Sequence, residues 1–194
     1  MPFAIWKLVS VINKFCSNED CEDAFIEPKF ESQVIQRSST RSTSLYRMKV
    51  SNQTRFIIEC LDTSRPIPIE EKKLSCQHFV ESLCYVLHNL PEPLFNIDSI
   101  DTPDELADLS IVCYTAFEQM SDASKSAFNF LLLFFRQLIS EYEIPIEYIM
   151  QTFSAVLIHR AKNEEIVLGV TPLTILHFAI TQSQDDENAE KDET

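Results

Sequence analysis

The sequence contains very little glycine: one residue in 194, Gly169. Loops that wrap around phosphate groups need several glycines, so P-loop and Rossmann nucleotide sites are not expected. Tight hairpin turns also depend on glycine, which makes a hairpin-rich β fold an unlikely product of this composition. The scarcity of glycine therefore argues against both nucleotide-binding α/β folds and hairpin-rich β folds.

The sequence also lacks an excess of basic residues and a long apolar run. Its net charge is −14, which provides neither a footprint for nucleic-acid phosphates nor a general attraction to anionic membranes. The longest apolar run, 128–138, is interrupted by Asn129, Arg136 and Gln137 and is too short to span a bilayer. The first residues do not have the pattern of a signal peptide. We therefore expect a cytoplasmic protein that binds no nucleic acid and does not insert into a membrane.

Six cysteines are present, but no CxxC motif. This usage is typical of buried or half-buried thiols in a reducing compartment. A zinc site built from Cys16, Cys21 and a histidine is an alternative, although the usual spacing of a full ligand set is missing. None of the four histidines stands beside a serine or cysteine in a recognisable nucleophile motif. We expect no metal, no other cofactor and no catalytic set.

Apolar residues recur at helical spacing along most of the chain. The clearest helix is 75–90, which begins at the potential N-cap Ser75 and ends before Pro91 and Pro93. Its apolar face is predicted to contain Phe79, Val80, Leu83, Val86, Leu87 and Leu90. The other predicted helices are 2–15, 54–61, one from Thr102, one from Ser121 or Asp122 to Tyr142, one from Pro145 and one from Thr171. The pattern predicts an all-α bundle of about seven helices. The residues expected to face inward on the last three helices are Phe128, Leu131, Leu132, Phe135, Leu138 and Ile139, then Ile149, Phe153, Val156 and Leu157, and finally Leu173, Leu176, Phe178 and Ala179.

The expected organisation is one domain over residues 1–182 with an acidic disordered tail at 183–194. Inside the domain, residues 38–53 are dense in serine and threonine and show no periodicity, which predicts a disordered surface insertion.

A family resemblance enters at the segment LPEPLF, residues 90–95, which follows the amphipathic helix 75–90. This corner resembles the RhoGAP fold, an all-helical domain that docks on Rho-type small GTPases. The closest resemblance is to the RhoGAP-like domain of the OCRL family, the type II inositol polyphosphate 5-phosphatases, and it covers 2–182 apart from the insertion. The segments that carry it are IWKLVSVINKF (5–15), ECLDTS (59–64), LPEPLF, NFLLLFFRQLISE (129–141) and FSAVLIHR (153–160). The family's phosphatase and ASH domains are not in this sequence, so phosphoinositide hydrolysis is not implied.

The resemblance also implies that the domain is not an enzyme. A catalytic RhoGAP uses an arginine finger, whose guanidinium offsets charge on the transferring phosphoryl group. That position corresponds to Ile26, which cannot supply this charge. Three further positions, which carry lysine, arginine and asparagine in catalytic members, correspond to Cys84, His88 and Val156. The alternative is an active Rho GTPase-activating protein that supplies Arg37, Arg41 or Arg47 from in or beside the insertion.

Trp6 is the only tryptophan of the chain and the predicted partner-binding residue. Tryptophan is enriched at binding hot spots. In the OCRL family a tryptophan at the matching position contributes to a groove for amphipathic helical "F&H" motifs of endocytic adaptors. The alternative is that Trp6 packs on the edge of the core.

The expected function is a non-catalytic RhoGAP-like protein-interaction module in signal transduction and membrane trafficking. The resemblance implies binding to these adaptor motifs and weak binding to Rho-family small GTPases. It also implies recruitment to endosomal or early endocytic membranes through such partners. A third interpretation is a fragment without a stable partner.

Overall fold

The computed structural model describes residues 3–18, 21–26, 50–90, 94–96, 109–159 and 172–192, without the side chains of 96, 159 and 183–192. These residues form an all-α fold with seven α-helices and one short 3₁₀-helix, as the sequence predicted. The helices are α1 (Phe3–Cys16), η1 (Glu22–Phe25), α2 (Asn52–Asp62), α3 (Cys76–His88), α4 (Leu109–Gln119), α5 (Asp122–Tyr142), α6 (Ile146–Leu157) and α7 (Pro172–Asp192).

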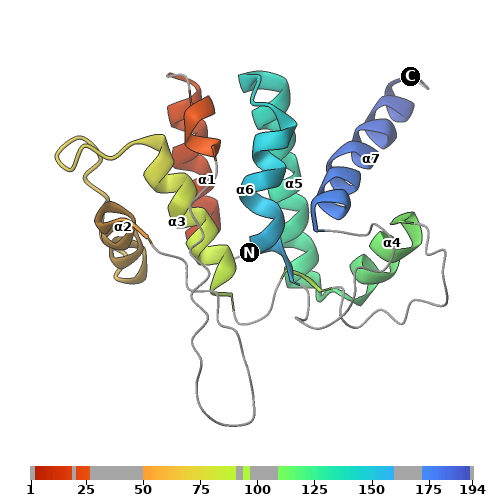
Figure 1. Ribbon diagram of the computed structural model, residues 1–194, viewed down its shortest axis with the longest axis horizontal. Helices are drawn as coiled ribbons and strands as arrows, with labels where there is room; N and C mark the ends of the chain where they lie inside the picture. Colours follow the sequence, from red (N-terminus) through yellow and green to blue (C-terminus); the bar gives the residue numbers. More distant parts are fainter. Residues whose placement is uncertain are drawn as a thin grey trace, which may run out of the picture.

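Helix α3 lies between α2 and α6 (Figure 1). It packs against α1, α2, α6 and η1. Helix α2 lies on the outer side of α3, and α5 lies beside α6. Helices α7 and α4 lie at the opposite side of the molecule (Figure 1). The helix with the clearest sequence pattern therefore connects the N-terminal elements α1, η1 and α2 to α6.

Helix α3 begins at a well-defined N-cap and buries one face. Ser75 is the N-cap, with extended backbone angles, and its backbone N–H donates to Nδ1 of His78 at 3.0 Å. The His78 side chain, at the third helical position, thus accepts a hydrogen bond from the backbone of the N-cap residue, as in a capping box. The residues of α3 that are buried are Cys76, Phe79, Val80, Ser82, Leu83, Cys84 and Leu87. The predicted apolar face is confirmed, with Val86 and Leu90 partly buried at its edge.

Helix α5 supplies much of the core. Its N-cap Ser121 accepts a hydrogen bond from the backbone N–H of Ser124 at 3.2 Å, which confirms the predicted start. The ring of Phe135 lies 4.8 Å, centroid to centroid, from the ring of Phe153 on α6. Both rings are fully buried, so α5 and α6 are held together by aromatic packing.

A short parallel ladder also joins two segments that are far apart in the chain. Strands β1 (Phe95–Asn96) and β2 (Ile158–His159) pair with Phe95 opposite Ile158. Side chains of Leu94 and Phe95 are buried, whereas residues 91–93 of the LPEPLF corner lie outside the described residues. The corner's end is thus attached to the end of α6, which no sequence pattern predicted.

Helix α2 begins earlier than the sequence predicted. It starts at Asn52, inside the expected insertion 38–53, because the Ser51 hydroxyl accepts from the backbone N–H of Thr54 at 3.1 Å and caps the first turn. The earlier part of the insertion, residues 38–49, lies outside the described residues, as does the helix start predicted at Thr102.

Helix α7 differs from the prediction in two respects. Its backbone continues to Asp192, where a disordered tail was expected from residue 183. Extending an existing helix requires far less free energy than starting one, and the extension contains alanine, glutamate and lysine, which favour helices. Leu173 was expected to face inward but is exposed, while Ile175, Leu176 and Ile180 form the buried face. No helix in the described part of the chain combines the length and the apolar composition needed to cross a membrane.

Candidate functional site

Ile26, the position that the resemblance assigns to an arginine finger, directly follows η1. Its backbone N–H donates to the carbonyl of Asp23 at 3.3 Å, and its own angles are extended. The side chain is 49% exposed, while the preceding Phe25 is completely buried. The loop therefore anchors itself through Phe25 and presents the aliphatic side chain of Ile26 to the surface.

Three elements meet behind this loop. Thr152 on α6 is buried and donates its hydroxyl to the carbonyl oxygen of Phe25 at 2.6 Å. The sulfur of Cys84 on α3 lies 3.8 Å from the carbonyl oxygen of the same Thr152 and donates to it. The structure thus brings the loop before Ile26, the middle of α3 and the middle of α6 to one place.

The other predicted positions lie on these same elements. Cys84 is completely buried, and burial is the main reason that the pKa of its thiol is raised far above the usual range. Val156 is buried on α6, and His88 is the partly buried last residue of α3. Cys84 and Val156 therefore contribute to packing, and neither presents a charge or a strong hydrogen-bond donor at the surface.

Trp6 belongs to a different surface, on the outer face of α1. Its side chain is 49% exposed, and its ring lies 6.1 Å from the ring of Phe3, which is 60% exposed. The ammonium group of Lys7 lies 5.7 Å from the centroid of the Phe3 ring. The buried face of α1 consists instead of Ile5, Leu8, Val9 and Ile12. Trp6 is thus part of an exposed aromatic pair and does not complete the core.

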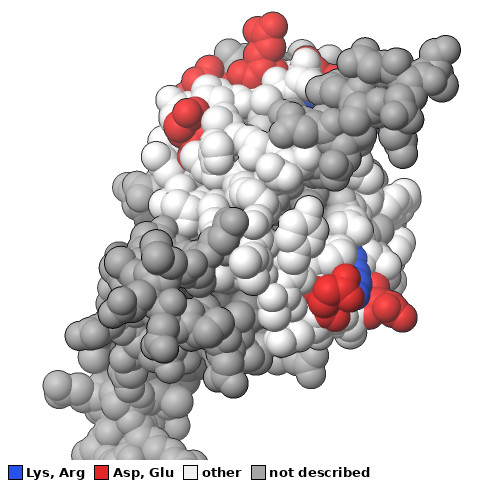
Figure 2. Space-filling view, turned by 90° about the vertical axis from the view of Figure 1, so that its right-hand side faces the viewer, with Lys and Arg blue, Asp and Glu red and all other residues white. Residues whose placement is uncertain are grey.

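A second group of exposed apolar side chains lies on other helices. It contains Ile111 and Tyr114 of α4, Leu133 of α5 and Leu173 of α7. Figure 2 shows the side of the molecule on which α4 and α7 lie, where most of the described surface carries no charged side chain. These residues are scattered over three helices, and exposed apolar residues of this kind are common on protein surfaces.

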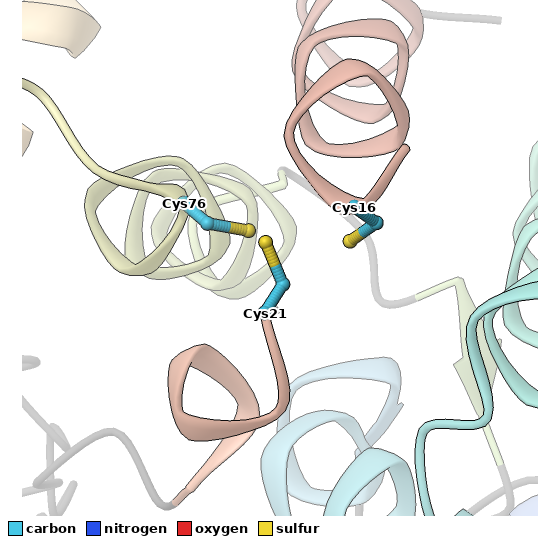
Figure 3. Close-up of side chains that lie close together, drawn as sticks. All are labelled: Cys16, Cys21 and Cys76. Carbon is cyan, nitrogen blue, oxygen red and sulfur yellow. The ribbon is translucent and has the colours of Figure 1, made fainter. Parts of the chain in front are cut away.

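Three cysteines converge at the ends of α1 and α3. The sulfur atoms of Cys16, Cys21 and Cys76 all lie within 4.8 Å of one another. Cys21 and Cys76 are buried and Cys16 is half-buried. Figure 3 shows the three side chains pointing into the same space from the end of α1, the residue before η1 and the first residue of α3.

This cluster revises the zinc alternative drawn from the sequence. Cys16 and Cys21 are together, as that alternative required, but the third position is taken by Cys76 and not by a histidine. None of the six cysteines forms a disulfide. The pKa of the Cys16 thiol is lowered, chiefly by a hydrogen bond with Cys76, and the same hydrogen bond raises the pKa of Cys76. The three thiols are therefore linked by hydrogen bonds.

Sequence reasoning did not identify Phe3, Thr152 or Cys76 as parts of these sites. Phe3 could have been found from its position three residues before Trp6, which places both rings on one helix face. Thr152 and Cys76 carried no comparable signal, because each acts on residues more than fifty positions away.

Comparison with known proteins does not identify a family for this chain. No model of a known protein family matches the chain, and no curated protein sequence matches it.

Proposed function

We propose that this chain is a non-catalytic, RhoGAP-like protein-interaction module that binds amphipathic helical motifs through the outer face of α1. The observation that carries the proposal is the exposed ring pair of Phe3 and Trp6. An apolar helix face gains most of its affinity from a few large anchors, and two adjacent exposed rings provide such an anchor point. The resemblance to the OCRL family supplies the class of partner, the F&H-type motifs of endocytic adaptors.

The absence of catalysis in this proposal rests on Ile26. The arrangement around it supports the assignment of this position, because Phe25, Thr152 and Cys84 connect the loop to α6 and α3. An aliphatic side chain at the surface cannot neutralise the charge that develops during phosphoryl transfer. Any contact with a Rho-family GTPase would then be a binding contact, and recruitment to endocytic membranes would occur through partners.

Trp6 provides a direct test, because it is the only tryptophan in the chain. The probe is a synthetic amphipathic helical peptide with a phenylalanine and a histidine on one face. We expect its addition to shift the tryptophan emission to shorter wavelength in a saturable manner, since the indole leaves water on binding. A peptide with the phenylalanine replaced by alanine is the control. An unchanged emission spectrum, together with no heat of binding by calorimetry, would contradict the proposed site.

The second candidate, an active GTPase-activating protein, has no observation in its favour. Its arginines, Arg37, Arg41 and Arg47, lie outside the described residues. The interpretation as a fragment without partners would be supported by failure of every binding measurement on a well-folded chain.

A further inference from the structure

We propose that Cys16, Cys21 and Cys76 bind one Zn²⁺ ion through three thiolate sulfurs, with a fourth position open to water or an external ligand. This inference is independent of the proposed binding function, since it uses different residues. It rests on the convergence of three cysteine sulfurs from three separate elements within 4.8 Å.

The geometry is close to that of a zinc site. Zinc–sulfur bonds are about 2.3 Å long, so neighbouring sulfurs in a tetrahedral site lie about 3.8 Å apart. In the cluster, no two sulfurs are more than 4.8 Å apart, which is about 1 Å longer than the distance in a tetrahedral zinc site. A small rotation of a cysteine side chain moves its sulfur by about this distance. Cys16 and Cys21 are separated by four residues, a spacing that occurs in structural zinc sites. Each pair of sulfurs would therefore have to approach by at most about 1 Å.

The chemistry of the ligands selects the metal. Three sulfur ligands without a carboxylate or histidine favour soft or borderline ions such as Zn²⁺ or Cu⁺ over Mg²⁺ or Ca²⁺. We select Zn²⁺ because a half-buried Cys16 leaves one side of the cluster accessible for a fourth ligand, as a tetrahedral ion requires. His78 is near in sequence to Cys76, but the cluster includes no ring nitrogen of a histidine among the described residues.

Zinc binding would change the protonation of the cluster. Cysteine binds a metal as its thiolate, so a bound dication displaces the thiol protons and zinc uptake releases protons to the solvent. Three zinc–sulfur bonds form, each thiol that was protonated releases one proton, and no electron is transferred.

A metal bound by these cysteines would join the ends of three helices. Cys16 is the last residue of α1, Cys76 is the first of α3, and Cys21 directly precedes η1. The bound ion would therefore fix the end of α1 to the start of η1, the short helix that Ile26 directly follows. Binding to the folded state raises the stability of that state, because Cys76 is far along the chain from Cys16 and Cys21 and meets them only on folding.

Cobalt provides the direct test, because Co²⁺ bound by thiolates absorbs visible light and gives a sulfur-to-metal charge-transfer band. The reduced full-length chain is titrated with Co²⁺ and then with Zn²⁺. We expect one Co²⁺ per chain, the intense visible bands of tetrahedral coordination, and displacement of Co²⁺ by Zn²⁺. Separate Cys16→Ala, Cys21→Ala and Cys76→Ala variants are each expected to lose at least about tenfold in affinity and part of the charge-transfer band.

Cys60→Ala and Cys113→Ala are matched controls, because both residues are buried cysteines outside the cluster. They should bind Co²⁺ as the unchanged chain does. A variant that fails to fold is recognised by its far-ultraviolet circular dichroism. In that case the ligands are counted on the unchanged chain, from the number of sulfur neighbours in the X-ray absorption spectrum of its zinc complex. We expect three.

Three results would overturn the proposal. One is the absence of cobalt or zinc binding by the reduced, folded chain. Another is binding that survives removal of all three cluster cysteines. The last is fewer than three sulfur neighbours around zinc. Formation of a disulfide between Cys21 and Cys76 under mild oxidation, in a chain that takes up no metal when reduced, would instead identify the cluster as a redox pair.

Discussion

The hydroxyl of Thr152 on α6 donates a hydrogen bond of 2.6 Å to the backbone carbonyl of Phe25, the residue that precedes Ile26. Both residues are completely buried, so this bond is shielded from water. It connects the loop that follows α1 to a helix more than one hundred residues later in the chain. The position of Ile26 therefore depends on a single buried side-chain contact as well as on the packing of Phe25.

Thr152→Val should destabilise the protein by about 1–3 kcal/mol, because the Phe25 carbonyl would remain buried without its partner. Urea unfolding followed by circular dichroism measures this change. Thr181→Val is the matched control, since the Thr181 hydroxyl donates to the His177 carbonyl at an exposed site, where substitutions typically change stability by less than about 0.5 kcal/mol. Equal effects of the two substitutions would show that the Thr152 bond contributes little.

Trp6→Ala should weaken binding of the F&H-type peptide by about 1–3 kcal/mol while leaving the unfolding free energy nearly unchanged. The physical reason is that Trp6 is half exposed and supplies contact area to the partner rather than to the core. Isothermal titration calorimetry is suitable, because it does not depend on tryptophan emission. Tyr114→Ala, an exposed aromatic on α4, is the control and should bind normally. If both variants bind equally well, the outer face of α1 is not the binding surface.

Single-turnover GTP hydrolysis by Rac-type and Cdc42-type GTPases should not accelerate when the domain is added in excess. An arginine finger typically contributes about 10³–10⁵ in rate, and Ile26 offers no charge with which to do so. The Arg37/Arg41/Arg47→Ala triple variant should give the same rate as the unchanged chain. A large acceleration that the triple variant abolishes would establish the active enzyme and refute the non-catalytic proposal.

Glu143→Gly should stabilise the protein by about 1 kcal/mol. Glu143 ends α5 in the left-handed region, with φ of 55°, and its N–H donates to the carbonyl of Leu138. Glycine adopts this conformation without the steric penalty that other residues experience. Glu141→Gly, two residues earlier within the helix, should have the opposite sign, since glycine inside a helix costs about 1 kcal/mol. Thermal unfolding of both variants tests the pair, and two destabilising results would contradict the expectation for Glu143.

Stability should decrease as the pH rises from about 9 to about 11. Burial raises the pKa of the Cys113 thiol from 9.0 to about 11, so the folded state retains a proton that the unfolded chain releases. The corresponding stabilisation is present below the unfolded pKa of 9.0 and is lost as the pH passes through the folded value. Cys113→Ala should reduce the slope of the unfolding free energy against pH by at most about one proton.

Val112→Ala is the control for this pH dependence, because it removes a buried neighbour that does not titrate. It should lower the overall stability and leave the slope unchanged. Urea unfolding at several pH values provides both quantities, and a slope unaffected by Cys113→Ala would exclude this thiol as the source.

The order and types of the helices followed from the sequence alone. Periodicity located the buried faces of α3, α5 and α6, and local signals placed the starts of α3 at Ser75, α5 at Ser121 and α6 at Pro145. These features are local: a helix face is set by neighbours three and four residues apart, and a cap by the first turn. Similarly, the aliphatic nature of Ile26 and the uniqueness of Trp6 could be read directly from the chain.

What only the tertiary structure decided are the contacts between distant segments. Leu173 fits the apolar pattern of α7 yet is exposed, because the position of the neighbouring helices selects which side of a helix is covered. The pairing of Phe95 with Ile158, the bond from Thr152 to Phe25 and the meeting of Cys16, Cys21 and Cys76 each join residues from separate elements. The spacing of residues along a chain does not encode such distances, because they depend on how helices pack around a shared core.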